Sequence, residues 1–404
     1  MTSVADRTAS FEANDSASPG AARSTTPQRG YFFGPLTDFL YLGGGSLIVL
    51  GAITIFLPQG ISDPQIASLM VVLMLLINQP HFAHSYQLFY RNFRNKAFGQ
   101  YPRALRLRYI LAGIIVPIAL VTFLAVGTLI ALRNGNTQVL GYGFNLMFFL
   151  VGWHYVKQGY GILIVDSVQK SFVFSESEKR ILRFNSYACW LLTWIGLNNT
   201  VAKVAPQIGI AYSTLALPAI AYHAIIVIGV ASTIGVAVVL IQMWRRSGSL
   251  PWAGVIAYLT TLYLWVMFAR LNPLVYILTS TFHSLQYLTV VWRYQLNVGV
   301  RPSSAKRSLI LAGFDRVIGA SVWRRLVFFV GCGIGLGYVF MDGLPRFLDT
   351  AIAYDHGTFG TNLFLFSFLL FINVHHYFLD SVMWRRGNPD IRQLFRPPGP
   401  VRQS

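Results

Sequence analysis

The sequence predicts an all-α protein, a polytopic bundle of about ten transmembrane helices with both termini in the cytoplasm. Of its 404 residues, 54% are hydrophobic and only 11% are charged, whereas soluble domains carry about 25% charged residues. Apolar stretches recur from Leu36 to Trp384, with lengths close to the roughly 20 residues that cross a bilayer. The net charge of +18 lies mainly between these stretches. It therefore indicates membrane topology, and nucleic-acid binding has no support.

The elements follow in chain order. Residues 1–32 are rich in Ser, Ala, Thr, Asp and Arg and lack an apolar run, so we expect a disordered cytoplasmic tail and no signal peptide. A transmembrane helical domain is predicted over residues 33–388, and a second cytoplasmic tail over residues 389–404. The predicted spans lie at 36–57, 65–90, 108–132, 138–164, 183–199, 216–243, 250–269, 273–292, 325–341 and 361–384.

The distribution of Lys and Arg sets the orientation, because cytoplasmic loops collect positive charge. With the N-terminus inside, basic residues concentrate in inner segments such as 91–108 and 170–183. The outer loops hold only Arg133, Lys203, Arg270 and Arg346. We therefore expect an integral membrane protein, in a bacterial inner membrane, with its N-terminus inside. Residues 303–324 mix apolar and basic side chains, which is typical of an amphipathic helix on the inner leaflet.

Several site classes have no support in the sequence. Cys189 and Cys332 both lie inside apolar runs, so they are predicted to be buried thiols and not a disulfide framework. We find no Gly-rich phosphate loop in the required context, no Ser-His-Asp string and no dinucleotide fingerprint. A reaction that needs electrons would depend on a separate electron-donor protein.

The histidines are the main functional signal. His81, His283 and His375 each lie ten residues before an arginine at the inner end of a predicted span. Three helices thus place a histidine at one depth, roughly 15 Å from the inner charges. His154 is expected in the same layer, while His84 and His376 lie close to His81 and His375. His223 and His356 lie toward the outer side and are interpreted as bystanders. Ionisable side chains at this depth normally face a bundle interior.

Each histidine of this layer lies on a polar stripe at helical spacing. The stripes occur in NQPHFAHSYQLFYR, WHYVKQGYG, TFHSLQYLTVVWR and NVHHYFLDSVMWRR. Imidazole is the commonest transition-metal ligand. We therefore predict metal ligands at His81, His84, His154, His283, His375 and His376. His375 and His376 differ by about 100° around the helix. They would therefore face two metals, or one would bind a metal while the other orients a ligand.

Four further residues are predicted to take part in the chemistry. Asp380 lies one turn beyond His376 and is a candidate carboxylate ligand or an acceptor that fixes an imidazole tautomer. Gln158 and Gln286 are candidate groups for orienting ligands or contacting substrate. Lys157, beside His154, would stabilise an oxyanion if it does not extend away from the layer.

The clusters HFAHSY and VHHYFLD resemble the histidine boxes of membrane non-haem iron oxygenases of the desaturase and hydroxylase type. The arrangement is also similar to that of bacterial multi-span beta-carotene cleavage oxygenases. These resemblances cover short segments, and the chain has no full HxxHH string. They imply dioxygen activation at one or two non-haem irons, with copper or zinc as other metals that histidine would hold. They also imply an apolar substrate, such as a carotenoid, another isoprenoid or an acyl lipid.

Other functions use the same layer. A proton-coupled or metal-ion transporter would employ the histidines as a relay or a path. A haem protein would use two of them as axial ligands, although six exceed that need. A purely structural role would not explain why so many imidazoles are buried at a cost in free energy. The sequence favours a metal-dependent membrane oxygenase over these alternatives.

Overall fold

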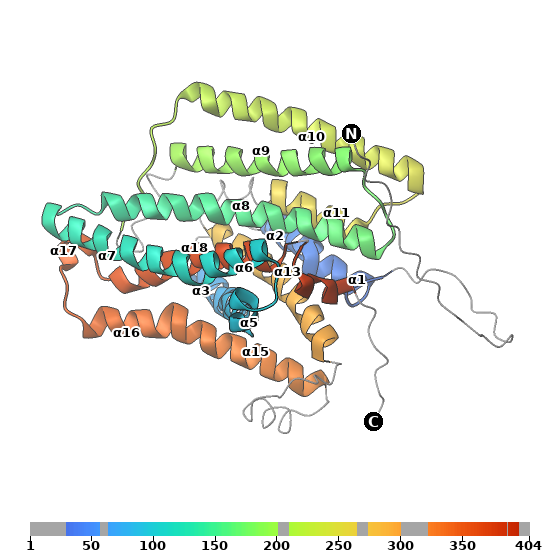
Figure 1. Ribbon diagram of the computed structural model, residues 1–404. Coiled ribbons are helices and arrows are strands. Elements are labelled where there is room, and N and C mark those ends of the chain that lie inside the picture. Colours follow the sequence, from blue (N-terminus) through green and yellow to red (C-terminus); the bar gives the residue numbers. More distant parts are fainter. Residues whose placement is uncertain are drawn as a thin grey trace, which may run out of the picture.

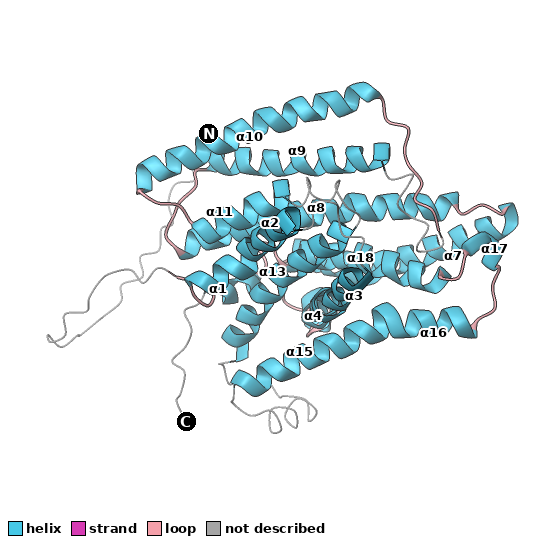
Figure 2. Cartoon of the chain, turned by 180° about the vertical axis from the view of Figure 1, so that it is seen from behind, coloured by secondary structure: helices cyan, strands magenta, loops and turns pink. Residues whose placement is uncertain are grey.

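The protein is described by a computed structural model over residues 30–56, 64–200, 210–264, 274–299, 322–385 and 387–395. The regular structure in these ranges is entirely helical, as predicted (Figures 1 and 2). Residues 1–29 of the tail predicted over 1–32, the amphipathic helix except for its last residues, and residues 396–404 lie outside the described residues. Residue Phe32, the last of that predicted tail, is fully buried.

The helices of the first half are α1 (Pro35–Phe39), η1 (Leu40–Gly44), α2 (Gly45–Phe56), α3 (Pro64–Leu73), η2 (Met74–Asn78), α4 (Gln79–Tyr90), α5 (Phe93–Phe98), α6 (Arg103–Ile110), η3 (Leu111–Ile115), α7 (Val116–Asn134), α8 (Gln138–Gln169) and α9 (Glu176–Thr200). Those of the second half are α10 (Ala219–Ser247), α11 (Trp252–Leu259), η6 (Thr260–Leu264), α13 (Leu274–Gly299), α15 (Val322–Tyr338), η7 (Val339–Gly343), α16 (Leu344–Ala351), α17 (His356–Phe359), α18 (Leu363–Met383) and η8 (Pro389–Phe395).

Six of these helical segments are long and apolar enough to cross a membrane, which is compatible with an integral membrane protein. They are Pro35–Ile53, Arg103–Asn134, Gln138–Gln169, Ala219–Ser247, Val322–Ala351 and Leu363–Met383. The remaining predicted spans also coincide with helices, including 65–90 with α3, η2 and α4 and 273–292 with α13. Those two helical segments carry the polar stripes around His81 and His283, which lowers their hydropathy.

The helices pack in layers around a central group (Figure 1). Helix α10 covers α9, α9 covers α8, and α8 contacts both α11 and α18. On the other side, α18 and α13 contact α4, which is covered by α15. The outer layers expose large apolar side chains, such as Val227 and Ile234 on α10 and Trp323 on α15. Extended apolar surfaces of this kind suit contact with lipid.

Three wide π turns share a sequence cause. Segments η2, η3 and η7 each end two residues before a proline, namely Pro80, Pro117 and Pro345. Proline has no N–H for the carbonyl four residues earlier, and its ring crowds that carbonyl, so a helix adjusts its pitch in the preceding turn. The turn at η2 directly precedes His81, and it therefore sets the direction in which this side chain leaves α4.

Helix α15 approaches α4 closely through small residues. A side-chain carbon added at Gly333 would lie 2.6 Å from Nε2 of His84, and one at Gly337 would lie 2.7 Å from the backbone of Gln79. The four-residue spacing places both glycines on one helix face, as in close helix pairs within membranes. Helix α15 thereby supports the segment of α4 that carries His81.

Substitution of Gly337 by alanine is expected to destabilise the protein by about 1–3 kcal/mol, because the clash is with backbone and forces α15 away from α4. Gly335 is the matched control, since a carbon added there meets nothing within 4 Å. Gly335→Ala should be neutral or stabilising by up to about 1 kcal/mol. Thermal unfolding of both variants in detergent measures the difference, and equal effects would contradict the close contact.

The segment after α18 packs against the inner connections. The Lys96 ammonium of α5 lies 3.3 Å from a carboxylate oxygen of Asp390, and Tyr101 donates a hydrogen bond of 3.0 Å to the same side chain. Burial lowers the pKa of Lys96, and the Asp390 carboxylate counteracts that shift. Leu394 is 2% exposed. Residues 389–395, part of the predicted tail, are therefore held on the helical domain.

Candidate metal centre

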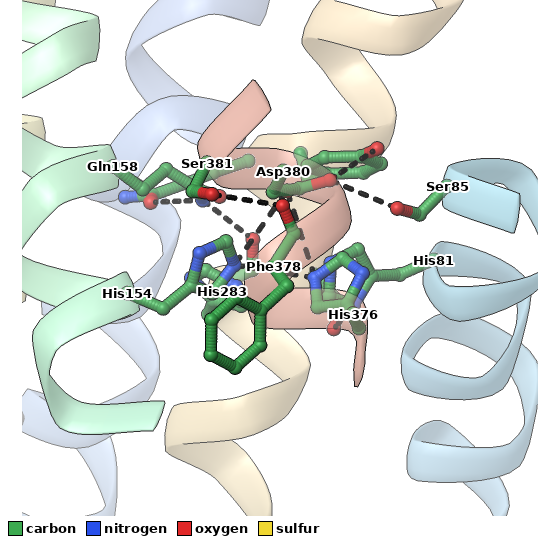
Figure 3. Close-up of polar contacts among 12 residues, drawn as sticks. His81, Ser85, His154, Gln158, His283, His376, Phe378, Asp380 and Ser381 are labelled. Atoms are coloured by element: carbon green, nitrogen blue, oxygen red, sulfur yellow. Dashed lines mark hydrogen bonds and ion pairs between the residues drawn. The ribbon is translucent and has the colours of Figure 1, made fainter. Parts of the chain in front are cut away.

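Four buried histidines, each from a different helix, converge within the bundle (Figure 3). They are His81 of α4, His154 of α8, His283 of α13 and His376 of α18. One ring nitrogen from each lies within 4.8 Å of the others, and none of the four residues is more than 8% exposed. We call this group the histidine centre.

The spacing in the histidine centre fits one metal ion. Imidazole nitrogens bind zinc-sized ions at about 2.0–2.1 Å, so two ligands of a tetrahedral site lie roughly 3.3 Å apart. The Nε2 atoms of His154 and His376 are 3.2 Å apart. The rings surround a void of about 10 Å³, close to the smallest cavity that holds a single water molecule. An ion therefore fits between them with small adjustments.

The hydrogen bonding of the rings is incomplete without such an ion. Both ring nitrogens of His283, Nε2 of His81 and Nδ1 of His376 have no hydrogen-bond partner among the described residues. Buried polar atoms nearly always have a partner, because an unpaired one costs about 1–3 kcal/mol. The unpaired nitrogens of His81 and His283 thus match donors for a metal, together with the Nε2 atoms of His154 and His376.

A hydrogen bond at Nδ1 of His81 orients the unpaired Nε2 of the same ring. Ser284 donates a hydrogen bond of 2.6 Å to the amide oxygen of Asn78, so its oxygen is available to accept from Nδ1 of His81, 3.1 Å away. Nδ1 then carries the proton, and Nε2 keeps its lone pair. This tautomer is the one that binds metal through Nε2, and such outer hydrogen bonds typically fix ligand orientation.

Asp380 lies beside the histidine centre and is 3% exposed. Its Oδ1 accepts hydrogen bonds from Ser85 at 2.8 Å and from Tyr287 at 3.2 Å. Its Oδ2 has no hydrogen bond and lies 3.7 Å and 3.6 Å from the Nε2 atoms of His154 and His376. One oxygen is thus anchored while the other faces the imidazoles, an arrangement suited to a fifth ligand.

Of the predicted polar residues on α8 and α13, Gln158 and Gln286 form hydrogen bonds between helices, whereas Lys157 faces a cavity. Gln158 donates hydrogen bonds to the backbone oxygen of His283 at 2.9 Å and to the side chain of Gln286 at 3.1 Å. Gln286 in turn donates to the backbone oxygen of Leu42. These glutamines therefore join α8, α13 and η1 around the centre. Lys157 is exposed to the cavity described below.

His84 and His375 lie outside the histidine centre. His84 stacks on Phe329 of α15, its Nε2 donates to the Phe329 backbone oxygen at 3.0 Å, and its Nδ1 faces Gln87. His375 donates from Nε2 to the backbone oxygen of Ala112 at 2.9 Å, and its Nδ1 accepts from the Tyr86 hydroxyl at 2.8 Å. Both nitrogens of each ring already have hydrogen-bond partners, which link α4 to α15 and α18 to η3.

Four residues around the centre were absent from the sequence prediction. Ser284 and Ser85 directly follow His283 and His84, and Tyr287 lies one turn after His283. Tyr155, next to His154, stacks on the ring of His283 with centroids 4.0 Å apart. The repeated His-Ser pair was visible in the sequence, but only the packed structure shows that these hydroxyls reach His81 and Asp380.

A cavity of about 720 Å³ adjoins the histidine centre, with His154, Tyr287, Tyr377 and Asp380 in its wall. Its volume is within the roughly 300–1,000 Å³ that is usual for small-molecule sites. Apolar side chains form most of the remaining wall, among them Phe32, Ile162, Val165, Phe172, Phe174, Val290 and Leu394. The cavity can therefore hold an apolar compound beside the buried histidines.

Comparison with known proteins supplies no further assignment: no family model, no curated protein and no solved structure matches the chain. The function is therefore argued from the geometry of the histidine centre and the adjoining cavity.

Proposed function

We propose that the protein is an integral membrane oxidoreductase, a non-haem iron oxygenase or hydroxylase that acts on a lipophilic substrate. The observation that carries this proposal is the convergence of four buried imidazoles, with unpaired nitrogens, at the end of a largely apolar cavity. A metal site beside a largely apolar cavity suits oxidative chemistry on a compound dissolved in the bilayer.

The donor set favours iron without a porphyrin. The four imidazole nitrogens approach a single point, which leaves no plane for a macrocycle between two axial ligands. Histidine together with a carboxylate, here Asp380, is a typical ligand set for non-haem iron. An iron ion bound there would supply the activation of dioxygen. Copper and zinc also bind imidazole, so the metal must be identified by analysis.

The chain's own residues prepare the site. His81, His154, His283 and His376 would hold the ion, and Asp380 would add an oxygen ligand or balance its charge. Lys157 and Gln158 in the cavity wall offer donors for negative charge that develops on the substrate. If the reaction needs external electrons, a donor protein would deliver them from the cytoplasmic side.

The proposal includes the membrane topology. We propose ten spans, with both termini in the cytoplasm of a bacterial cell and the protein in its inner membrane. Each predicted span coincides with helix in the described ranges, and the basic residues cluster at the proposed inner ends. The cavity then opens toward the cytoplasmic side, since its wall continues from α8 into the connection before α9.

The test is metal analysis of the full-length protein purified in a mild detergent. We expect about one iron per chain by elemental analysis and no Soret band, together with dioxygen consumption when a carotenoid or acyl lipid that acts as substrate is added. Copper or zinc in place of iron would overturn the assignment of the metal. A folded protein without any metal would overturn the oxygenase and favour a proton-coupled or metal-ion transporter that uses the same histidines.

A further inference from the structure

Lys157 of α8 lines the cavity and differs from the other lysines of the described ranges. Each of those three has its ammonium within 3.3 Å of a carboxylate oxygen, namely Lys96, Lys170 and Lys179. Lys157 has neither an ion pair nor a hydrogen bond to another described residue. An ammonium that faces a mainly apolar space without a partner is costly. We therefore expect a ligand in the cavity to contact Lys157.

The charges around Lys157 bear on the kind of ligand. Lys157 and Asp380 lie in the cavity wall together with His154, and the two charged groups interact electrostatically. An anionic ligand at Lys157 would bring a second negative charge close to Asp380, which is unfavourable. A neutral ligand that becomes cationic on reaction with the amine would retain the attraction to Asp380. The remaining charged groups in the wall belong to α9: Glu176, Lys179 and Arg183.

We propose that Lys157 binds an apolar aldehyde covalently, as an imine, with the hydrocarbon part of the aldehyde in the cavity. The Nζ amine adds to the carbonyl carbon and the product loses one water molecule, so a carbon–nitrogen double bond replaces the carbon–oxygen double bond. No electrons are exchanged, and water reverses the reaction. The protonated imine carries one positive charge, which Asp380 balances. Lysine amines in apolar pockets are typical nucleophiles for carbonyl groups.

The cavity has room for a long-chain aldehyde. Its wall follows α8 from His154 to Val168, a length of about 21 Å at 1.5 Å per residue, and its volume is about 720 Å³. The inference goes beyond the proposed oxygenase, since it concerns the amine and not the metal. Oxidation of an alcohol, or oxidative cleavage of a carbon–carbon double bond, is the class of reaction that must supply such an aldehyde.

Trapping of the imine in the purified full-length protein tests the proposal. The protein in mild detergent is incubated with hexadecanal and sodium cyanoborohydride, which transfers a hydride to an imine and fixes it as a secondary amine. Peptide mass spectrometry then gives the modified fraction of each lysine. We expect at least about tenfold more adduct on Lys157 than on Lys179, which lines the same cavity but pairs with Glu176. Equal modification of the two lysines would overturn the proposal.

A short aldehyde shows whether the cavity holds the hydrocarbon chain. Propanal has little apolar surface to bury, so its preference for Lys157 over Lys179 should be at least about tenfold smaller than that of hexadecanal. The same preference with both aldehydes would overturn the binding of the chain in the cavity.

Variants assign the adduct to the amine. Lys157→Arg retains the positive charge but removes the nucleophile, so the total hexadecanal adduct per chain should fall at least about tenfold. Lys179→Arg is the matched control in the same cavity and should leave the total unchanged. An unmodified Lys157, together with hexadecanoate binding that Lys157→Gln weakens, would identify an anion site and overturn the imine.

Metal analysis of the same preparations separates this inference from the proposed function. Bound iron without an adduct on Lys157 would overturn the imine and leave the oxygenase in place. A selective adduct on Lys157 in a protein that holds no metal would overturn the oxygenase and leave the aldehyde site in place.

Discussion

Replacement of His376 by alanine is expected to lower the affinity for the proposed metal more than about 100-fold, which exceeds the loss that follows removal of a hydrogen-bond partner of a ligand. His376 contributes one of four converging nitrogens, 3.2 Å from that of His154. The loss leaves an incomplete donor set and opens the site to water. Elemental analysis after gel filtration measures the metal that remains on the protein.

The neighbouring histidine provides the control for this experiment. His375 is as deeply buried as His376, at 2% exposure each, but its nitrogens bond to Tyr86 and Ala112. His375→Ala should therefore lower the stability by about 1–3 kcal/mol and retain the metal. Loss of metal from both variants, or from neither, would contradict the placement of the histidine centre.

Replacement of Asp380 by asparagine is expected to lower metal affinity by about 10- to 100-fold. Asparagine retains an oxygen that accepts from Ser85 and Tyr287, so the fold around it should persist. The negative charge facing His154 and His376 is lost. Titration of the metal-free protein with iron under anaerobic conditions gives the affinity of each variant.

Asp166, a second buried carboxylate, tests whether the effect on metal affinity is specific to Asp380. Asp166 pairs with Lys170 at 2.6 Å and accepts a hydrogen bond from the backbone of Gly254 at the start of α11. Asp166→Asn should reduce thermal stability without changing iron affinity. If it reduced iron affinity as much as Asp380→Asn does, the role assigned to Asp380 would be wrong.

The helical architecture was predictable because apolar runs of membrane length leave few alternatives to helix. The predicted span 138–164 lies within α8, and 361–384 matches α18 within two residues at each end. The positions of the wide π turns were harder to predict from the sequence, since they depend on how a helix accommodates each proline. The ten predicted spans were counted from apolar runs and oriented by charge, and six helical segments among the described residues meet the criteria of length and apolarity.

The depth of the histidines along their helices was predictable from the sequence, but the neighbour that each histidine faces was not. Counting residues to the inner arginines placed histidines of several helices at one level, and the structure brings four of them together. His84 follows His81 by three residues, about 60° away around the helix. That difference is enough for His84 to face α15 instead, and a single sequence does not reveal which neighbour covers each helix face.

Beyond the histidine centre, toward the N-terminal ends of α8 and α18, the described residues form a close-packed apolar cluster around Phe144, Phe366 and Leu370. The cavity thus ends at the histidines within the described part of the chain. If the protein is the oxygenase proposed above, substrate and product would share the open part of this cavity, and each product would leave before the next substrate arrives. A product that is more polar than its substrate would leave the apolar cavity more readily. Where conversion leaves the compound apolar, product release would limit turnover.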